Sequence, residues 1–364
     1  MRTIPLALRC GLGLFLAAGA VLPPVAHACS RPVYLGADDQ VVTARSMAWD
    51  AEMPTNLRAF PRDMQRSGEV GPNSIRWTSR YGSVVAATYE NSTADGMNEA
   101  GLLANALWLK ESSYPAFEGS RPGLGTAAWA RYVLDNFATV QQAVEALRAE
   151  PFILVSSRLP GLGGVATVHL SLSDAGGDSA IIEYVDGRQT IHHSRAYQVM
   201  TNSPAFEKQL ATQEYWREIG GTVFLPGTSR AADRFARASF HVHALPKTPD
   251  PVKTIASAFS VIRNVSVPFG ISSPDEPNIA STRWRPVSDH KRRRYFESAI
   301  TPNVYWVDLT RFDFSPATGR PLKLELGPEE SNIYSGMVNA QFKPAAPFRF
   351  AGFPLTSLRD AISA

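Results

Sequence analysis

Cys29 is the residue in this sequence whose position most clearly suggests chemistry, because it directly follows the tripeptide Ala26-His27-Ala28. Two arginines precede a short apolar run at 10–21, and the tripeptide has the Ala-x-Ala form of a signal-peptidase site. The run is too short for a transmembrane helix. We therefore predict a signal peptide over residues 1–28 and an exported, periplasmic mature chain that begins at Cys29.

Cleavage after Ala28 would leave a thiol and a free α-amine on the same residue, Cys29. A thiolate is a strong nucleophile. An α-amine titrates at about pH 8, so it can act as the base that takes the thiol proton. This pair of groups predicts an N-terminal cysteine nucleophile.

Two other interpretations of Cys29 remain open at this point. It could be an ordinary residue beside a cleavage site, or the lipid-modified first residue of an envelope lipoprotein. A lipoprotein signal favours Leu three positions before the Cys, where this sequence has Ala26. The only other cysteine, Cys10, leaves with the leader, so no internal disulfide is possible. A single cysteine in an oxidising compartment favours a chemical role.

Composition indicates a large globular domain and excludes a nucleic-acid binder. Removing 28 of 364 residues leaves 336 and lowers the formal net charge from +3 to +1. The basic run at 291–294 is interpreted as a solvated face or a local contact. The hydrophobic content is 44%, with 7 Trp and 18 Phe, and no linker interrupts the chain. We predict one domain over residues 29–364.

The first third of the mature chain is predicted to be mostly sheet, because short β-branched runs alternate with turn residues. The predicted strands are 33–35, 41–49, 56–61, 75–78, 83–89 and 102–109. The segment 95–101 has Gly near both ends and is predicted as a turn. Strands return at 167–173, 179–185, 188–192, 196–201, 282–284, 294–297 and 304–309.

Four helices are predicted from apolar spacing and capping residues. The first spans 126–137, and the second follows Thr139, which has Gln142 in capping-box register. The others span 230–242 and 250–261, the last led by Asp250-Pro251. These elements predict an α+β fold with one pair of helices on a sheet and a second helical layer.

Other polar residues could also take part in chemistry. Arg45 lies on a predicted strand, where a cation near a thiol would favour the thiolate, although a surface Arg is the alternative. Asn202 follows a strand in Asn-Ser-Pro and could form a turn or donate to an oxyanion. His241 and His243 are interpreted as helix-end histidines rather than metal ligands. The glycines at 161–164 do not fit a dinucleotide fingerprint and are predicted to form a loop.

Five segments together resemble a known family. They are Cys29-Ser30-Arg31, Ala44-Arg45-Ser46-Met47-Ala48-Trp49, Asp95-Gly96-Met97-Asn98-Glu99-Ala100-Gly101-Leu102, Thr201-Asn202-Ser203-Pro204 and Asp233-Arg234-Phe235-Ala236-Arg237. In this order they resemble the choloylglycine hydrolase family, and most closely its Gram-negative penicillin V acylase branch. The resemblance implies a four-layer αββα N-terminal nucleophile (Ntn) hydrolase fold.

The resemblance also implies roles for individual residues. Cys29 would be the nucleophile with its own α-amine as base, and Arg45 the cation near the thiolate. Asn202 and the backbone N–H of Trp108 would form the oxyanion hole. Arg234 would be the late active-site arginine, with Arg237, one turn further on, as the alternative.

The sequence departs from the family at Ala48, where the family has an Asp that holds the α-amine and the nucleophile. Asp50 falls on the same face of the strand but about 6.6 Å further along it. Because of this departure, a second hypothesis stays open: the chain is a weakened or inactive homologue that acts as an acyl-ligand binding protein.

The resulting functional prediction is hydrolysis of a linear amide bond without metal or cofactor. Trp49 and Trp108 could line an apolar acyl pocket or simply pack in the core. Such a pocket would suit phenoxyacetyl amides, such as penicillin V, or fatty-acyl homoserine lactones. No nucleic-acid or membrane partner is predicted, and the resemblance implies a homotetramer.

Overall fold

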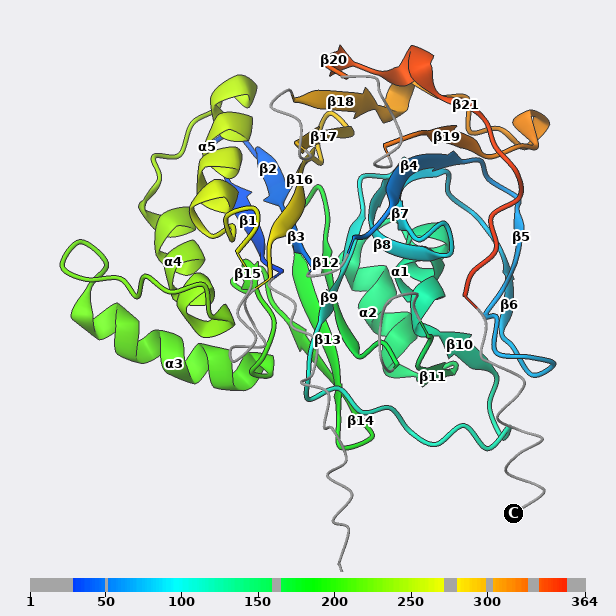
Figure 1. The fold of residues 1–364 in the computed structure, drawn as a ribbon, viewed down its shortest axis with the longest axis horizontal. Helices are drawn as coiled ribbons and strands as arrows, with labels where there is room; N and C mark the ends of the chain where they lie inside the picture. Colours follow the sequence, from blue (N-terminus) through cyan, green and yellow to red (C-terminus); the bar gives the residue numbers. More distant parts are fainter. Residues whose placement is uncertain are drawn as a thin grey trace, which may run out of the picture.

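Two mostly antiparallel sheets lie face to face, and helices cover the outer side of each, so the layers follow the order αββα (Figure 1). The computed structural model describes residues 29–49, 52–158, 165–271, 280–298, 304–326 and 334–351. The predicted signal peptide at 1–28, Asp50 and the loop at 161–164 lie outside the described residues. The arrangement confirms the predicted fold class.

The first sheet contains the strand that follows Cys29. Its strands, in spatial order, are β15 (Val199–Met200), β1 (Arg31–Leu35), β2 (Val41–Ala44), β16 (Thr282–Asp289), β17 (Arg294–Ser298), β18 (Tyr305–Asp308) and β20 (Gly336–Met337), with β3 (Met47–Ala48) beside β16. The strand predicted at 41–49 breaks at Arg45 and Ser46. There the backbone of Ser46 pairs with that of Ser30 through two hydrogen bonds of 2.9 and 3.3 Å.

The second sheet is longer and carries much of the pocket described below. Its strands, in spatial order, are β14 (Arg188–His193), β13 (Ser179–Val185), β12 (Val168–Ser173), β9 (Leu103–Trp108), β8 (Ser92–Asn98), β7 (Ser83–Thr88), β4 (Thr55–Phe60), β19 (Leu322–Leu324) and β21 (Lys343–Pro344). Two small pairs lie outside it: parallel β10 (Gly123–Gly125) with β11 (Ile153–Val155), and β5 (Gln65–Ser67) with β6 (Arg76–Thr78).

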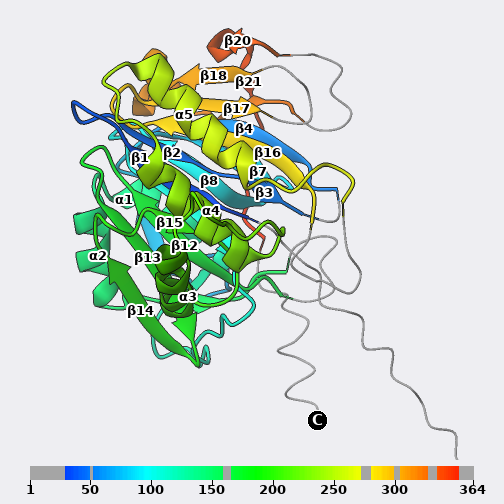
Figure 2. The ribbon, with the colours of Figure 1, turned by 90° about the vertical axis from the view of Figure 1, so that its left-hand side faces the viewer.

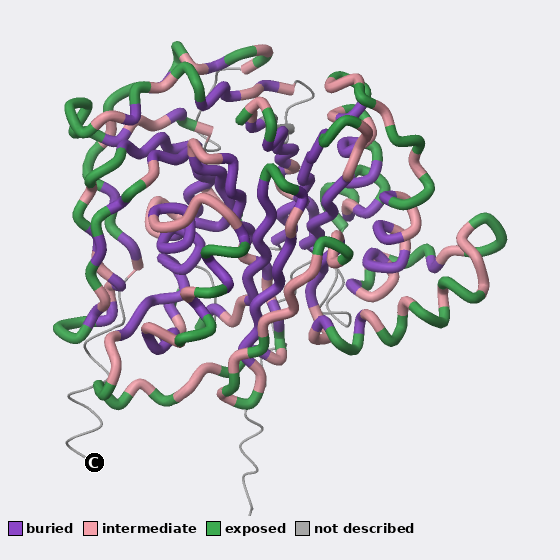
Figure 3. Tube along the Cα trace, turned by 180° about the vertical axis from the view of Figure 1, so that it is seen from behind, coloured by how far each residue is buried: buried purple, intermediate pink, exposed green. Residues whose placement is uncertain are grey.

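Each sheet has its own helical cover. α1 (Thr126–Asn136) and α2 (Val140–Arg148) pack on the second sheet. α4 (Ala231–Ala244) and α5 (Pro251–Asn264) pack on the first, and α3 (Phe206–Ile219) lies against α4 (Figure 2). Among the helices in the described ranges, none combines the length and the apolarity that a membrane span requires. The buried residues gather along the facing strands and the inner sides of the helices (Figure 3).

The predicted helices and their caps are confirmed with small shifts in length. The Thr139 hydroxyl accepts from the Gln142 N–H at 3.2 Å, and the Asp250 carboxylate caps α5 at 2.9 Å. α3 was not predicted, because its sequence is polar around most of the helix and only Phe206 and Gln209 are buried. The strand predicted at 196–201 shortens to Val199–Met200, since Tyr197 closes a turn onto Ser194.

The turn predicted at 95–101 is wrong, because β8 continues through most of it. Gly96 is there for close packing: a Cβ at this position would lie 2.6 Å from the Val85 side chain and 2.8 Å from the Val84 carbonyl. The turn begins only after Asn98, whose side-chain oxygen accepts the N–H groups of Ala100 and Leu102. The polar residue Asp95 is therefore inside a strand.

The basic run at 291–294 makes contacts within the chain. Arg292 donates to Gln40 at 2.7 Å and to Asp289 at 3.0 Å, and Lys291 donates to the Asp38 carbonyl at 3.1 Å. These bonds fix the turn between β16 and β17 against the turn between β1 and β2.

Candidate active site

Cys29 lies two residues before β1, with only 2% of its surface exposed. The pairing of Ser30 with Ser46 places Cys29 directly across from Met47, so both side chains project on the same face. The Cys29 Sγ lies 3.7 Å from the Met47 Sδ and 3.9 Å from the Ala48 carbonyl oxygen. Strand register thus determines where the thiol points.

Arg234, on α4, joins Cys29 to the rest of the site. Its Nη1 donates to the Cys29 carbonyl and to the Ser30 Oγ, both at 2.5 Å, and its Nη2 donates to the Asn202 Oδ1 at 2.9 Å. Burial lowers the pKa of Arg234 to about 10, and the charge of Cys29 opposes that shift, so the guanidinium stays cationic near neutral pH. Arg237 instead donates to the carbonyls of Pro226 and Thr228. The structure therefore places Arg234, not Arg237, at Cys29.

Asn202 has its amide orientation fixed from both ends. Its Oδ1 accepts a hydrogen bond from Arg234, and its Nδ2 donates to the Trp108 carbonyl at 2.8 Å. Leu109 donates its N–H to Thr167 on one side of β9, so by strand alternation the polar backbone groups of Trp108 face the other side, toward Asn202. The backbone of Trp108 and the side-chain amide of Asn202 therefore meet on this side of β9.

The turn that carries Asn202 is anchored by buried polar side chains. Gln209 donates to the carbonyls of Asn202 and Pro204. Glu183 accepts the first N–H of α3, from Phe206, at 3.0 Å. Burial would raise the pKa of Glu183, but hydrogen bonds from His169 and His192 outweigh it and lower the pKa to about 2. The anchor is therefore a carboxylate at neutral pH.

Arg45 approaches the thiol from the other side. Its Nη2 donates to the Ala106 carbonyl at 2.7 Å and lies 3.8 Å from the Met47 Sδ, so the thioether stands between the guanidinium and Cys29. The guanidinium also packs over the Trp284 ring, 4.9 Å from its centroid. Two buried cations therefore lie close to Cys29: Arg45 contacts the Met47 thioether beside the thiol, and Arg234 contacts the Cys29 carbonyl.

Asp95 is the buried partner of Arg45, and the sequence analysis missed it. Its Oδ2 lies 3.7 Å from the Arg45 Nη1, and it accepts hydrogen bonds from Tyr295, at 2.7 Å, and Asn105. Burial raises the pKa of Asp95 above its ordinary value, while Arg45 opposes the shift. The sequence did contain one sign of this site, because Asp95 and Asn105 are polar residues in two consecutive segments. In the structure these two residues are direct neighbours across β8 and β9.

A small apolar cavity of about 50 Å³ opens at Cys29. Its aromatic lining includes Trp49 and Trp108, whose rings meet edge to face with centroids 6.2 Å apart. The full lining is Cys29, Arg45, Met47, Trp49, Met53, Thr88, Ser92, Thr93, Ala94, Ala106, Trp108, Thr126, Ala127, Ala166 and Val168. Both predicted substrate-binding tryptophans thus lie in the cavity that contains the thiol.

The methyl group of Ala48 is fully buried and packs against Val267. Met47 projects toward Cys29, so strand alternation turns Ala48 to the opposite face. Among the described residues, the carboxylate nearest to the cation Arg45 is Asp95, on the other sheet. Within the described residues, the position that corresponds to the family Asp in the sequence is occupied by this buried methyl group.

The comparison with protein-family models decides the family. Residues 29–318 match the model described as linear amide C–N hydrolases, choloylglycine hydrolase family. The chain belongs to the choloylglycine hydrolase family. The match begins at Cys29, where the nucleophile of this family would stand after processing.

Relatives of this choloylglycine hydrolase cover nearly the whole chain. It is 54% identical to a protein of Pectobacterium atrosepticum named penicillin V acylase, covering 90% of this chain and 93% of that protein. It is 61% identical to the solved structure of penicillin V acylase from Agrobacterium tumefaciens, with a TM-score of 0.84, covering 89% of this chain and 100% of that one. A conjugated bile acid hydrolase structure from Clostridium perfringens, 19% identical with a TM-score of 0.69, shares the fold; the match covers 84% of this chain and 99% of that one.

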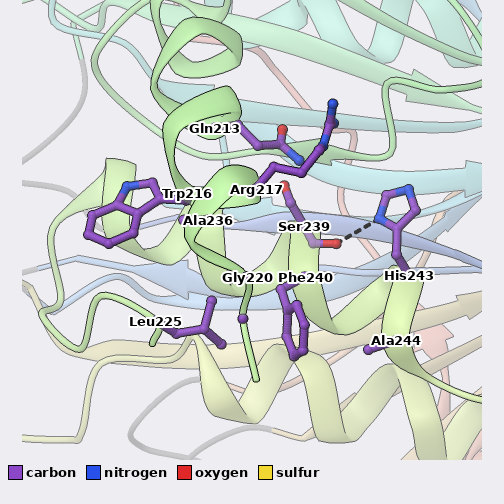
Figure 4. A pocket seen from close by; sticks show the side chains of 11 residues that line it. Gln213, Trp216, Arg217, Gly220, Leu225, Ala236, Ser239, Phe240, His243 and Ala244 are labelled. Carbon is purple, nitrogen blue, oxygen red and sulfur yellow. Dashed lines mark hydrogen bonds between the residues drawn. The ribbon is translucent and has the colours of Figure 1, made fainter. Parts of the chain in front are cut away.

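A larger cavity of about 380 Å³ lies between α3 and α4, and none of the predicted site residues lines it (Figure 4). Its walls include Trp216, Leu225 and Phe240, with Arg217 at one side. His243, in the last turn of α4, is bonded to the Ser239 carbonyl at 2.7 Å, as expected for a helix-end histidine. Within the described ranges, no group of three or more His, Cys, Asp or Glu side chains is arranged to hold a metal ion.

Replacing Asp95 tests its role in holding Arg45. Asp95→Asn should lower kcat/KM by about ten- to a hundredfold, because Arg45 loses its buried counter-charge and about 1–3 kcal/mol of interaction. Since burial raises the pKa of Asp95, the wild-type rate should fall as the pH drops through that raised pKa, and Asp95→Asn should lose that dependence. The measurement is the pH profile of kcat/KM on folded protein.

Asp135→Asn is the matched control, because Asp135 is an equally buried carboxylate that pairs with Arg131 at 2.8 Å. Both variants should lower the unfolding midpoint, since each removes one partner of a buried pair. Only Asp95→Asn should change the pH profile. An equal change in the two profiles would show that Asp95 acts on stability alone.

Proposed function

We propose that this choloylglycine hydrolase is a penicillin V acylase that cleaves phenoxyacetyl or fatty-acyl amides with Cys29 as its nucleophile. The observation that carries the proposal is the Cys29 thiol in an apolar cavity, tied through Arg234 to the oriented amide of Asn202. Identities of 54% and 61% to proteins named penicillin V acylase support the same substrate class.

In the proposed reaction, the free α-amine of processed Cys29 takes the thiol proton and the thiolate attacks the amide carbon. Negative charge develops on the carbonyl oxygen, where the Asn202 N–H and the Trp108 N–H can donate. One such donor is commonly worth about 3 kcal/mol of transition-state stabilisation. The α-ammonium returns the proton to the leaving amine, and water then releases the acid from the thioester.

The proposed roles of the flanking residues follow from their contacts. Arg234 positions both Cys29 and Asn202, and Arg45 stabilises negative charge at the thiolate across Met47. Trp49 and Trp108 supply aromatic surface for the acyl group. The cavity of about 50 Å³ admits only a small part of the acyl group, so these side chains must move apart when substrate binds.

The location of the enzyme is part of the proposal. We infer that residues 1–28 are an export signal and that the mature protein is periplasmic, on the basis of the Ala-x-Ala site before Cys29. Removal of that leader would also create the catalytic α-amine. A lipid-anchored product would instead have a blocked Cys29.

Mass spectrometry of the intact exported protein tests the nucleophile and the processing together. With penicillin V, the wild type should start at Cys29, gain the mass of a phenoxyacetyl group transiently and release product, whereas Cys29→Ala should do neither. Turnover by purified Cys29→Ala would exclude the mechanism.

The same experiment separates the alternatives. An acylated, blocked start would identify a lipoprotein. A free Cys29 start with neither adduct nor product would favour an acyl-ligand binding protein, the alternative that Ala48 suggests.

Restoring the family carboxylate tests how much Ala48 lowers kcat. The Ala48 methyl lies on the strand face opposite to the Cys29 thiol, so a carboxylate at this position would act through the backbone α-amine of Cys29, by accepting its hydrogen bond and raising its basicity. Ala48→Asp should therefore raise kcat by about tenfold, equivalent to about 1.4 kcal/mol. Ala48→Asn has the same size without the charge. If Asn raises kcat as much as Asp does, the charge is not what the site lacks.

We further propose a homotetramer, as the family resemblance implies. The supporting observation is a group of apolar side chains on α3 and the segment after it. Tyr215, Val223 and Phe224 are 59%, 80% and 56% exposed, and Phe224 stacks on Trp216.

Light scattering of the mature protein should give four chain masses. Phe224→Glu should lower that mass, because a charge would be buried at the contact. Val252→Glu, at an exposed position on α5, should leave the assembly intact. A monomeric wild type would contradict the proposal.

A further inference from the structure

One hydroxyl in the wall of the Cys29 cavity is buried without a partner. Thr93, on β8, is 1% exposed and lines the cavity. Its Oγ1 forms no hydrogen bond within the part of the chain that the structure describes. A buried polar atom without a hydrogen bond lowers the stability of the fold by about 1–3 kcal/mol. A hydroxyl kept at such a position therefore suggests a functional role.

A β-bulge explains why Thr93 lies in the wall of the cavity. Ala86 is opposite Asp95 and Ala87 is opposite Thr93, so Ala94 is one extra residue in β8. Successive residues of a regular strand point to opposite faces, but a bulge re-aims one side chain. Thr93 and Ala94 consequently both line the cavity, while Asp95 reaches Arg45.

Thr93 is one of several polar groups in the wall. The hydroxyl of Thr126 already accepts the Ser157 N–H at 2.9 Å. Arg45 donates through Nη2 to the Ala106 carbonyl and lies 3.7 Å from Asp95, while its Nε and Nη1 form no hydrogen bond within the described residues. Much of the remaining wall is apolar, formed by Met47, Met53, Trp49, Trp108, Ala94, Ala106, Ala127, Ala166 and Val168. A hydroxyl in such a wall can recognise one oxygen in an otherwise apolar group.

The size of the cavity indicates which oxygen of the acyl group the Thr93 hydroxyl would contact. When Cys29 attacks, the carbonyl carbon of the acyl group is bonded to Sγ, so the next atoms of the chain must enter first. A volume of about 50 Å³ holds only a few atoms. The atom that can meet a wall hydroxyl there is the one attached to the α-carbon.

We propose that Thr93 makes this enzyme selective for acyl groups whose third chain atom, the one attached to the α-carbon, is an oxygen or carries one. Aryloxyacetyl, 3-oxoacyl and 3-hydroxyacyl amides form this class. The inference rests on the proposed function and names the part of the substrate that the site reads. The Thr93 hydroxyl donates to an ether or ketone oxygen, and it can also accept from a 3-hydroxyl group.

Two substrates that differ by one atom test the inference. The phenoxyacetyl and 3-phenylpropionyl amides of the same amine have equal length, and a methylene replaces the ether oxygen in the second. We expect the wild type to favour the phenoxyacetyl amide by about tenfold in kcat/KM. Thr93→Val, which keeps the shape of the side chain, should bring this ratio close to one, and Thr93→Ser should preserve it.

Thr88→Val is the matched control, because Thr88 lines the same cavity from the adjacent strand β7. Its ratio of kcat/KM for the two amides should equal that of the wild type. If Thr93→Val lowers kcat/KM for both amides equally, or if Thr88→Val changes the ratio as much, Thr93 does not read the oxygen.

A binding measurement keeps this test separate from the test of the proposed function. If the wild type cleaves neither amide, the acylase proposal fails, and calorimetry with phenoxyacetate and 3-phenylpropionate then reports on Thr93 alone. Preference for phenoxyacetate in the wild type, lost in Thr93→Val, supports the inference. Equal affinities in the wild type overturn it.

Discussion

The guanidinium of Arg234 is the interaction on which the site depends most. A fully buried cation is costly to desolvate unless its N–H groups are satisfied. Here they are bonded to the carbonyls of Ser229 and Cys29, the hydroxyl of Ser30 and the amide oxygen of Asn202. These groups come from a helix end, the first strand and the turn after β15, so one side chain holds three segments of the chain in register.

Arg45 performs the corresponding task between the two sheets. It extends from the first sheet to the Ala106 carbonyl and the Asp95 carboxylate of the second. Tyr295, from β17, donates back to the same carboxylate. The thiol lies beside this crossing. The Arg45 side chain therefore links the two sheets and also places a positive charge near Cys29.

The sequence contained enough information for the fold and for most of the site, where local rules apply. Helix caps such as Asp250 and apolar spacing depend on neighbouring residues and gave correct elements. Cys29 and Asn202 stand in short motifs whose chemistry can be read directly, and the structure brings both to one Arg234.

Residues whose roles depend on distant partners escaped prediction. Asp95 and Gly96 have the composition of a turn, but burial against Arg45 and Val85 keeps them in a strand. Helix α3 has no apolar stripe to announce it, since it buries only Phe206 and Gln209. The choice between Arg234 and Arg237 likewise required knowing where helix α4 lies against β1.

The contacts of Arg234 reach the carbonyl of Cys29 and neighbouring side chains, and none of them involves the Cys29 amine. The contacts that join Cys29 to Asn202 therefore do not depend on a free N-terminus at Cys29. Under the proposed processing, removal of residues 1–28 would add a single proton acceptor to contacts that Arg234 already makes. The latency of such a precursor would be chemical rather than conformational.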